Sequence, residues 1–203
     1  MLCAHGGAWL MLRTDGDLRA RSAQATKIMG IVFLVCFLGA GAWLYFGNIQ
    51  GYTLVQPFDT NGVANPLAKE VLTNANPGWM NNYSDYPITI IAPIMATLGG
   101  LIIILGASKS KAGITFTGSS LAVTGAILTA GFALFPFLMP SSLNPTVSLT
   151  MWDAVSSKNT LTVMTVAACI FVPLILIYTT WCYYKMWGVI TNKHVQENTH
   201  SLY

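Results

Sequence analysis

Four long segments that are almost free of charge constrain this chain more than any other feature. Each has 20 or more residues, and Lys185, near the end of the last segment, is the only charged residue in them. A helix needs about 20 mostly apolar residues to cross the hydrocarbon core of a bilayer. We therefore expect four complete transmembrane helices, at residues 28–47, 88–107, 113–138 and 161–187.

The composition agrees with a membrane protein. Only 8% of the 203 residues are charged and 54% are hydrophobic, whereas soluble domains carry about 25% charged residues. So few charges cannot cover a soluble surface of this size, which excludes a soluble domain. The fold class that we predict is an all-α integral membrane protein, a helical bundle in which residues 1–203 form one membrane domain.

The first residues, 1–12, are apolar but span about half the length that a transmembrane helix requires. No basic region precedes them, so they do not resemble a secretory signal peptide. We expect the inner half of a truncated N-terminal transmembrane helix that begins upstream of Met1. On this interpretation the sequence is a fragment or begins at an internal start.

Basic residues predict the orientation, because cytoplasmic loops are enriched in Lys and Arg. The segments on one side carry eight of them, against Lys69 and Lys158 on the other side. The eight are Arg13, Arg19, Arg21, Lys27, Lys109, Lys111, Lys185 and Lys193. We therefore expect a cytoplasmic tail at 188–203 and periplasmic loops at 48–87 and 139–160.

Small residues recur at every fourth position in two of the predicted spans. Helices in a bilayer associate through close packing of such residues, and the short turn at 108–112 should fold these two spans into an antiparallel hairpin. We predict a helix-packing face, although Ala and Gly are also common in membrane helices for no specific reason. Its members are Ala92, Ala96 and Gly100 in one span and Gly118, Ala122, Ala126 and Ala130 in the other.

The sequence offers little catalytic chemistry. It contains no GxSxG, P-loop, HExxH or GxGxxG motif, and its four cysteines form no CxxC pair that would indicate a metal site or a c-type haem. His5 is the one histidine in an apolar segment. It could ligate haem, but the chain offers it no obvious partner ligand, so we favour a packed or hydrogen-bonded histidine at a helix interface. We expect no catalytic residue and no metal site.

The predicted periplasmic loops contain three further features, and the first of them is open to more than one interpretation. Trp152 and Asp153 precede the last span, where an acid beside a tryptophan could guide protons or contact a partner, or could belong to an ordinary anchored loop. Residues 65–71 have the pattern of a short helix, with Asn65 as N-cap and proline at the first helical position. Ser156, Ser157 and Asn159 are candidate N-caps for the last span.

The stretch FPFLMPSSLNPTVSLTMWDAVSS, with the later IYTTWCYYKMWG, resembles the C-terminal half of subunit II of the cytochrome bd ubiquinol oxidases. The strings HGGAWLMLRTDGDL, NPLAKEV and ENTHSLY are similar to the same family, so the resemblance covers the chain nearly from end to end. The family's N-terminal part, with its His-Trp-Asp-rich stretch, has no counterpart in this sequence.

The resemblance implies a bacterial inner-membrane complex that oxidises ubiquinol and reduces dioxygen to water. It implies haem b and haem d bound mainly through subunit I, ubiquinone as a further cofactor, and subunit I, membrane lipid and quinone as partners, with no nucleic acid. It transfers no catalytic residue to this chain. The alternative function is a small membrane transporter or scaffold. The sequence argues against a transporter, because it has no polar group at mid-membrane that would support a substrate path.

Overall fold

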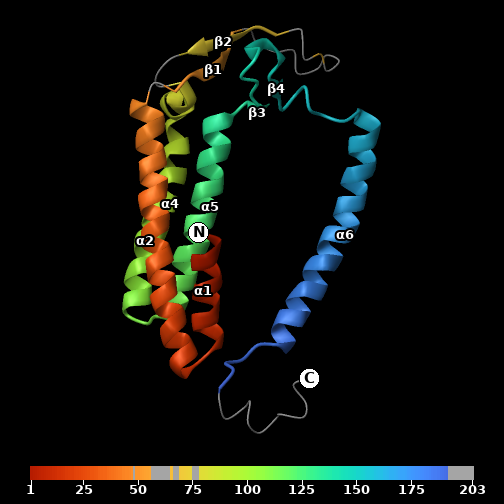
Figure 1. The fold of residues 1–203 in the computed structure, drawn as a ribbon. Coiled ribbons are helices and arrows are strands. Elements are labelled where there is room, and N and C mark those ends of the chain that lie inside the picture. The colour runs from red at the N-terminus through yellow and green to blue at the C-terminus, as the bar shows by residue number, and fades with distance from the viewer. Residues whose placement is uncertain (48, 56–64, 66–68, 75–77, 192–203) are drawn as a thin grey trace.

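The computed structural model describes residues 1–47, 49–55, 65, 69–74 and 78–191. Its long helices run roughly parallel to one another, and the small strands and short helices gather at one end of them (Figure 1). We call that end the cap, and the opposite end, where the turn between α4 and α5 lies, the hairpin end. Within the described residues, four helices are long and apolar enough to cross a membrane. The expectation of an all-α integral membrane protein is therefore confirmed.

The helices lie close to the predicted segments. A 12-residue helix, α1 (Leu2–Arg13), precedes the four candidate spans. The spanning helices are α2 (Gly16–Phe46), α4 (Ile91–Ser108), α5 (Ala112–Leu134) and α6 (Lys158–Lys185). The largest difference is in α2, which begins 12 residues before Ile28. The segment between Leu12 and Ile28, which lies outside the predicted spans, is mostly helix, because its basic residues are good helix formers that extend α2 out of the apolar region.

The helix α5 ends at Leu134, four residues earlier than predicted. Pro136 has no N–H to continue the helical ladder, and the residue before a proline avoids the helical conformation; Phe135 accordingly has an extended ψ of 135°. The side chain of Asn82 donates to the carbonyls of Phe132 and Phe135 at 2.8 and 2.5 Å. Residues 135–138, which we predicted as the end of the third span, therefore belong to the cap.

The cap contains two small antiparallel sheets and several short helices. The strand β1 (Gly51–Leu54) pairs with β2 (Val71–Asn74), and β3 (Phe137–Met139) pairs with β4 (Leu149–Thr150). The short helices are η1 (Gly78–Met80), α3 (Asn81–Asp85), η2 (Pro87–Ile90) and η3 (Pro145–Val147). The Tyr52 hydroxyl donates to the carbonyl of Ser141 at 2.8 Å, which connects the two sheet regions.

The short helix predicted at residues 65–71 is wrong where the structure describes it. Lys69 and Glu70 are not helical, and Val71 is a buried residue of β2. Pairing with β1 and burial of the Lys69 side chain outweigh the local helix signal of the Asn-Pro start, since propensity is a weak preference that tertiary contacts override. Residues 66–68 lie outside the described part of the chain.

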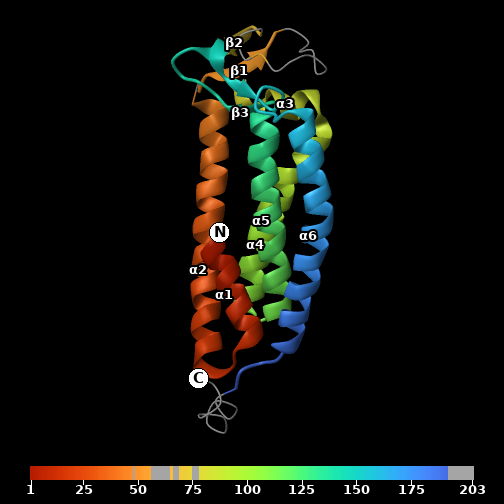
Figure 2. The ribbon, with the colours of Figure 1, turned by 90° about the vertical axis from the view of Figure 1, so that its right-hand side faces the viewer.

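The packed core lies among α1, α2, α4 and α5. It contains Ala4 of α1, Phe33 and Leu34 of α2, Ala96 and Ile103 of α4, and Ala122 of α5. By contrast, α6 stands away from these helices along most of its length (Figure 1) and has no buried residue. Figure 2 shows it running alongside the bundle from the cap to the hairpin end.

The first turn of α6 is capped within the helix, and the chain at its other end contacts α1. At the start of α6 the hydroxyl of Ser157, one of the three predicted N-caps, accepts from the Thr160 N–H. Beyond its other end, the Ile190 N–H donates to the carbonyl of Arg13 at 2.8 Å. The Arg13 guanidinium lies over the rings of Trp9 and Trp187, 5.3 and 5.0 Å from their centroids, and donates to the carbonyl of Met186.

Candidate functional site

The face between α4 and α5 brings four of the predicted packing residues together. Ala92, Ala96 and Ala122 are fully buried and Gly118 is buried. Two glycines outside the predicted set make the closest approach. A Cβ added to Gly99 would lie 2.4 Å from the Ala122 backbone nitrogen, and one added to Gly125 would lie 2.3 Å from that of Ala96. The two backbones therefore touch where any larger side chain would collide, as membrane helix pairs with small residues do.

The other three predicted packing residues lie elsewhere. Gly100 faces α2, where an added Cβ would lie 2.5 Å from a methyl group of Leu34. Ala126 and Ala130 line a cavity next to α2, and Ala130 is exposed. A repeat of four residues drifts around a helix with 3.6 residues per turn, so the predicted stripe leaves the interface after about two turns.

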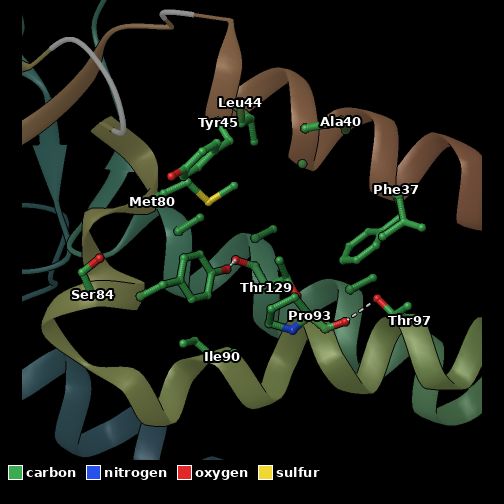
Figure 3. A pocket seen from close by; sticks show the side chains of 17 residues that line it. Phe37, Ala40, Leu44, Tyr45, Met80, Ser84, Ile90, Pro93, Thr97 and Thr129 are labelled. Carbon is green, nitrogen blue, oxygen red and sulfur yellow. Dashed lines mark hydrogen bonds between the residues drawn. The ribbon is translucent and has the colours of Figure 1, made fainter.

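That cavity lies between α2 on one side and α4 and α5 on the other, at the cap half of the bundle (Figure 3). Its volume is about 710 Å³, within the range of about 300–1,000 Å³ that is typical of ligand pockets. The helix α2 contributes a run of small residues, Ala40, Gly41 and Ala42. A Cβ added to Gly41 would meet no atom within 4 Å, so the space beside this glycine is open.

Most polar groups of the cavity wall are already bonded to the protein. The Tyr83 hydroxyl donates to the carbonyl of Thr129 at 2.7 Å, and the hydroxyls of Thr97 and Thr129 donate to carbonyls of their own helices at 2.8 and 2.6 Å. Seventeen residues line the cavity, and none of them is Asp, Glu, Lys, Arg or His. The cavity therefore offers an apolar wall without a charged group.

In the cap, Asp153 forms an ion pair that the sequence did not predict. Lys69 Nζ lies 2.5 Å from Asp153 Oδ2, and the two side chains are 2% and 0% exposed. The same oxygen accepts from the backbone N–H and the hydroxyl of Thr150, at 2.9 and 2.6 Å. Burial of the carboxyl group acts to raise the pKa of Asp153, but the hydrogen bonds from Lys69 and Thr150 outweigh it and hold this pKa below its ordinary value.

This geometry favours the anchoring role among those considered for Trp152 and Asp153. The pair joins two loops that are 84 residues apart in sequence, and the ring of Trp152 packs edge-on against Phe135, with centroids 6.2 Å apart. Sequence reasoning missed Lys69 because we assigned it to a short helix. A signal in the sequence could have identified Lys69. A buried acid requires a basic partner, and the predicted outer loops contain only two basic residues, Lys69 and Lys158.

His5 lies on α1 against α5. Its Nδ1 is 2.8 Å from the Ser119 hydroxyl oxygen. Since that hydroxyl donates to the carbonyl of Phe116 at 2.8 Å, the geometry has the His5 Nδ1–H donating to Ser119. The imidazole also packs on the ring of Phe116, with centroids 5.0 Å apart. A space of about 530 Å³ adjoins His5 and is walled mainly by aromatic rings: Trp9, Phe116, Tyr183 and Trp187.

The described residues cannot supply two histidine ligands to one haem. His5 is the only histidine among them, and no cluster of three or more His, Cys, Asp or Glu side chains suited to a metal ion occurs in the described part. We therefore derive no haem chemistry from these residues. The interpretation of His5 as a hydrogen-bonded residue at a helix interface agrees with its contacts to Ser119 and Phe116.

Together these features define a class of protein: a multi-pass helical membrane protein with a packed helix hairpin, an ion-paired cap and an apolar cavity. Residues 1–186 match the family of cytochrome bd terminal oxidase subunit II. The chain therefore belongs to this family.

Three relatives show the extent of the similarity. Over all 203 residues the chain is 45% identical to cytochrome bd-I ubiquinol oxidase subunit 2 of Escherichia coli K12, and it covers 53% of that protein. It is 38% identical over the same length to a probable cytochrome oxidase subunit 2 of Haemophilus influenzae, again covering 53%. Cytochrome bd ubiquinol oxidase subunit 2 of Bacillus subtilis is 30% identical over 197 residues, which are 95% of this chain and 48% of that protein. The chain spans about half the length of the curated relatives it matches.

Proposed function

We propose that this chain acts as part of the second subunit of a bd-type respiratory oxidase, which oxidises ubiquinol and reduces dioxygen to water. The observation that carries the proposal is the 45% identity over the whole chain to a subunit named for ubiquinol oxidation. Such a complex contributes to aerobic electron transport and to the proton-motive force.

Within that complex we assign this chain a structural role and place haem b and haem d on subunit I. Three features support the assignment: the tight α4–α5 hairpin, the buried Lys69–Asp153 pair and the hydrogen-bonded imidazole of His5. Each of them holds elements of the chain together. None presents a charged group to a cavity in the described spans, where an ion or proton path would need one.

We further propose that the hairpin end of the bundle faces the cytoplasm of a bacterium, with the protein in the inner membrane. Lys109 and Lys111 flank the turn at this end, and the Arg19 side chain donates to the carbonyl of Ser110 in the same turn at 3.1 Å. Lys69, a basic residue of the cap, is buried in its ion pair. This asymmetry follows the positive-inside rule and supports the proposal, which includes a cytoplasmic C-terminus.

A chimera tests the proposed function. Residues 1–203 replace the matching part of the Escherichia coli subunit 2, and the chimera is coexpressed with subunit I in cells that lack other bd-type oxidases. We expect it to copurify with subunit I, to support ubiquinol-driven oxygen consumption and to preserve the haem absorption spectrum. A chimera that copurifies with subunit I but supports neither haem incorporation nor oxygen consumption would contradict the proposal.

A second version of the chimera, carrying Gly99→Leu, is the matched control. It should fail to copurify because the leucine collides with the backbone of α5 at Ala122. Solute uptake by vesicles that contain this chain alone would instead support the transporter alternative.

A further inference from the structure

Three cations meet at the turn between α4 and α5, at the hairpin end of the bundle (Figure 1). Lys109 and Lys111 flank Ser110 in this turn, and both are exposed. Arg19 reaches the turn from α2, and its guanidinium donates to the Ser110 carbonyl at 3.1 Å, across 91 residues of sequence. We call Arg19, Lys109 and Lys111 the hairpin cation cluster. The fold, and not the local sequence alone, assembles it.

The turn holds the two lysines in a defined position. The Ser110 N–H donates to the Ala107 carbonyl at 3.1 Å, and the Lys111 N–H donates to the Gly106 carbonyl at 2.9 Å. Ser110 itself has a left-handed backbone, with a φ of 50°. The backbone that carries the lysines is therefore ordered before any ligand arrives, which lowers the entropy cost of binding.

Within the described part of the chain, no carboxylate forms an ion pair with this cluster. The buried pair Lys69–Asp153 lies in the cap, at the other end of the bundle. Asp15 and Asp17, at the start of α2, form no ion pair with the cluster in the described residues. Like charges that share one turn repel each other, so an anion bound at the turn would be stabilised by all three.

The helix surface next to the turn is apolar and exposed. Gly106 and Thr115 face each other across the hairpin, since a Cβ added to Gly106 would lie 2.6 Å from the Thr115 hydroxyl oxygen. Leu105 and Ile114 each precede one of these residues, which is about 100° of helical rotation. Because α4 and α5 are antiparallel, both rotations lead to the same side of the pair. Leu105 is 61% exposed there and Ile114 is 48% exposed.

The two lysines are the helix-surface neighbours of these apolar residues. Lys109 follows Leu105 by four positions, and Lys111 precedes Ile114 by three, the spacings that bring side chains together on a helix. Cations therefore stand at the end of the two spans, with exposed apolar side chains directly beside them on the side of the membrane interior. A dissolved anion would use the cations alone, whereas a phospholipid would use both parts.

We propose that the hairpin cation cluster binds the phosphate of one anionic phospholipid, whose acyl chains lie along Leu105 and Ile114. Basic groups at the edge of a membrane span are attracted to anionic headgroups in this way. The lipid would neutralise the turn that joins α4 to α5. This inference depends on the membrane location of the chain and not on the proposed oxidase function.

Two pairs of basic residues provide a matched test. Lys109→Gln/Lys111→Gln removes two charges from the cluster, and Arg21→Gln/Lys27→Gln removes two from exposed positions of α2 outside it. The full 203-residue chain and both double variants are purified in detergent and depleted of lipid. Each is titrated with dioleoyl phosphatidylglycerol, which is anionic, and with dioleoyl phosphatidylethanolamine, which is zwitterionic and has the same acyl chains. Native mass spectrometry counts the bound lipid.

We expect the unmodified chain and Arg21→Gln/Lys27→Gln to retain one phosphatidylglycerol about tenfold more tightly than phosphatidylethanolamine. Lys109→Gln/Lys111→Gln should bind phosphatidylglycerol about tenfold more weakly than the unmodified chain. Equal binding of the two lipids by the unmodified chain, or equal losses in the two double variants, would overturn the proposal. So would glycerol phosphate that displaces phosphatidylglycerol at equal concentration, because the site would then bind a dissolved anion.

A salt titration tests the same site without any substitution. Raising sodium chloride from 50 mM to about 0.5 M screens exposed charges and should release phosphatidylglycerol from the unmodified chain while leaving bound phosphatidylethanolamine unchanged. If Lys109→Gln/Lys111→Gln loses its helical circular dichroism, this titration takes its place. Retention of phosphatidylglycerol that does not depend on salt would contradict an electrostatic site at the turn.

Discussion

The helices α4 and α6 are equally apolar and long enough to span a bilayer, yet the protein uses them differently. Seven residues of α4 are buried, including three glycines, Gly99, Gly100 and Gly106. No residue of α6 is buried, and its sequence contains no glycine. Since lipid tails are as apolar as leucine, hydropathy places a helix in the membrane but does not pack it against another. Packing requires small residues that let two backbones approach.

The largest loss of stability is expected when α4 receives a large side chain where it touches α5. We expect Gly99→Leu to lower the free energy of unfolding by about 4 kcal/mol, because the clash is with the Ala122 backbone and not with a flexible side chain. Unfolding in a titration with sodium dodecyl sulfate measures the change. Gly131→Leu on α5 is the control, since a Cβ there meets nothing within 4 Å; equal losses for the two variants would refute the close approach.

A weaker effect is expected in the cap, which holds the loop before α6. Lys69→Met leaves the buried Asp153 carboxylate without its cation and should cost about 3 kcal/mol near neutral pH. Lys158→Met serves as the control, because Lys158 forms no ion pair within the described part of the chain. The same unfolding titration measures both, and a cost no larger than that of Lys158→Met would show that the ion pair does not stabilise the cap.

The pH dependence of this pair has a defined sign. The pKa of Asp153 is held below its ordinary 3.8 in the folded protein. Its contribution is therefore fully present above about pH 4 and is lost as the pH falls through the lowered value. The difference in stability between the unmodified chain and Lys69→Met should shrink below that pH. A difference that stays constant down to pH 2 would mean that the carboxylate is not the group involved.

The contacts between Arg13 and the far end of α6 should contribute less to stability than the ion pair of the cap. Arg13→Gln removes both cation–π contacts and the bond to the Met186 carbonyl, which we estimate at about 1 kcal/mol. We expect cleavage after Lys185 by a lysine-specific protease to become about fivefold faster, because that end of α6 opens more often. The exposed Arg21 supplies the comparison, and Arg21→Gln should leave the rate unchanged.

The smallest effect is expected at the contact between α1 and α5. His5→Phe keeps a ring against Phe116 but loses the hydrogen bond to Ser119, and intramembrane hydrogen bonds average about 0.6 kcal/mol. In the chimeric oxidase this variant should leave the haem absorption spectrum unaltered. Loss of a haem band together with normal subunit assembly would make His5 a ligand and reverse our interpretation.

The sequence was sufficient to locate the spans because membrane insertion depends on the hydropathy of about 20 consecutive residues. It was less informative where tertiary contacts decide the structure. The helix α5 ends at Leu134 because of a proline that a hydropathy average ignores, and Val71 joins a strand through pairing with a residue 17 positions away in the chain, Leu54.

The packing residues were only partly predictable for a geometric reason. A period of four finds Ala96 and Ala122 but passes over Gly99 and Gly125, which lie on the same face three residues from them. In α4 the adjacent residues Gly99 and Gly100 serve two different neighbours, α5 and α2. Which neighbour each one meets depends on how three helices are arranged, and a single sequence does not contain that information.

The ion pair of the cap also bears on how the chain is made. Membrane helices enter the bilayer in order as the ribosome delivers them, and Lys69 emerges 84 residues before Asp153. Between the two lie both helices of the hairpin, so Lys69 cannot find its partner until α4 and α5 have crossed the bilayer and returned the chain to the same side. Formation of this pair therefore marks the completion of hairpin insertion, and a chain stalled before Asp153 would lack the carboxylate that neutralises Lys69 in the cap.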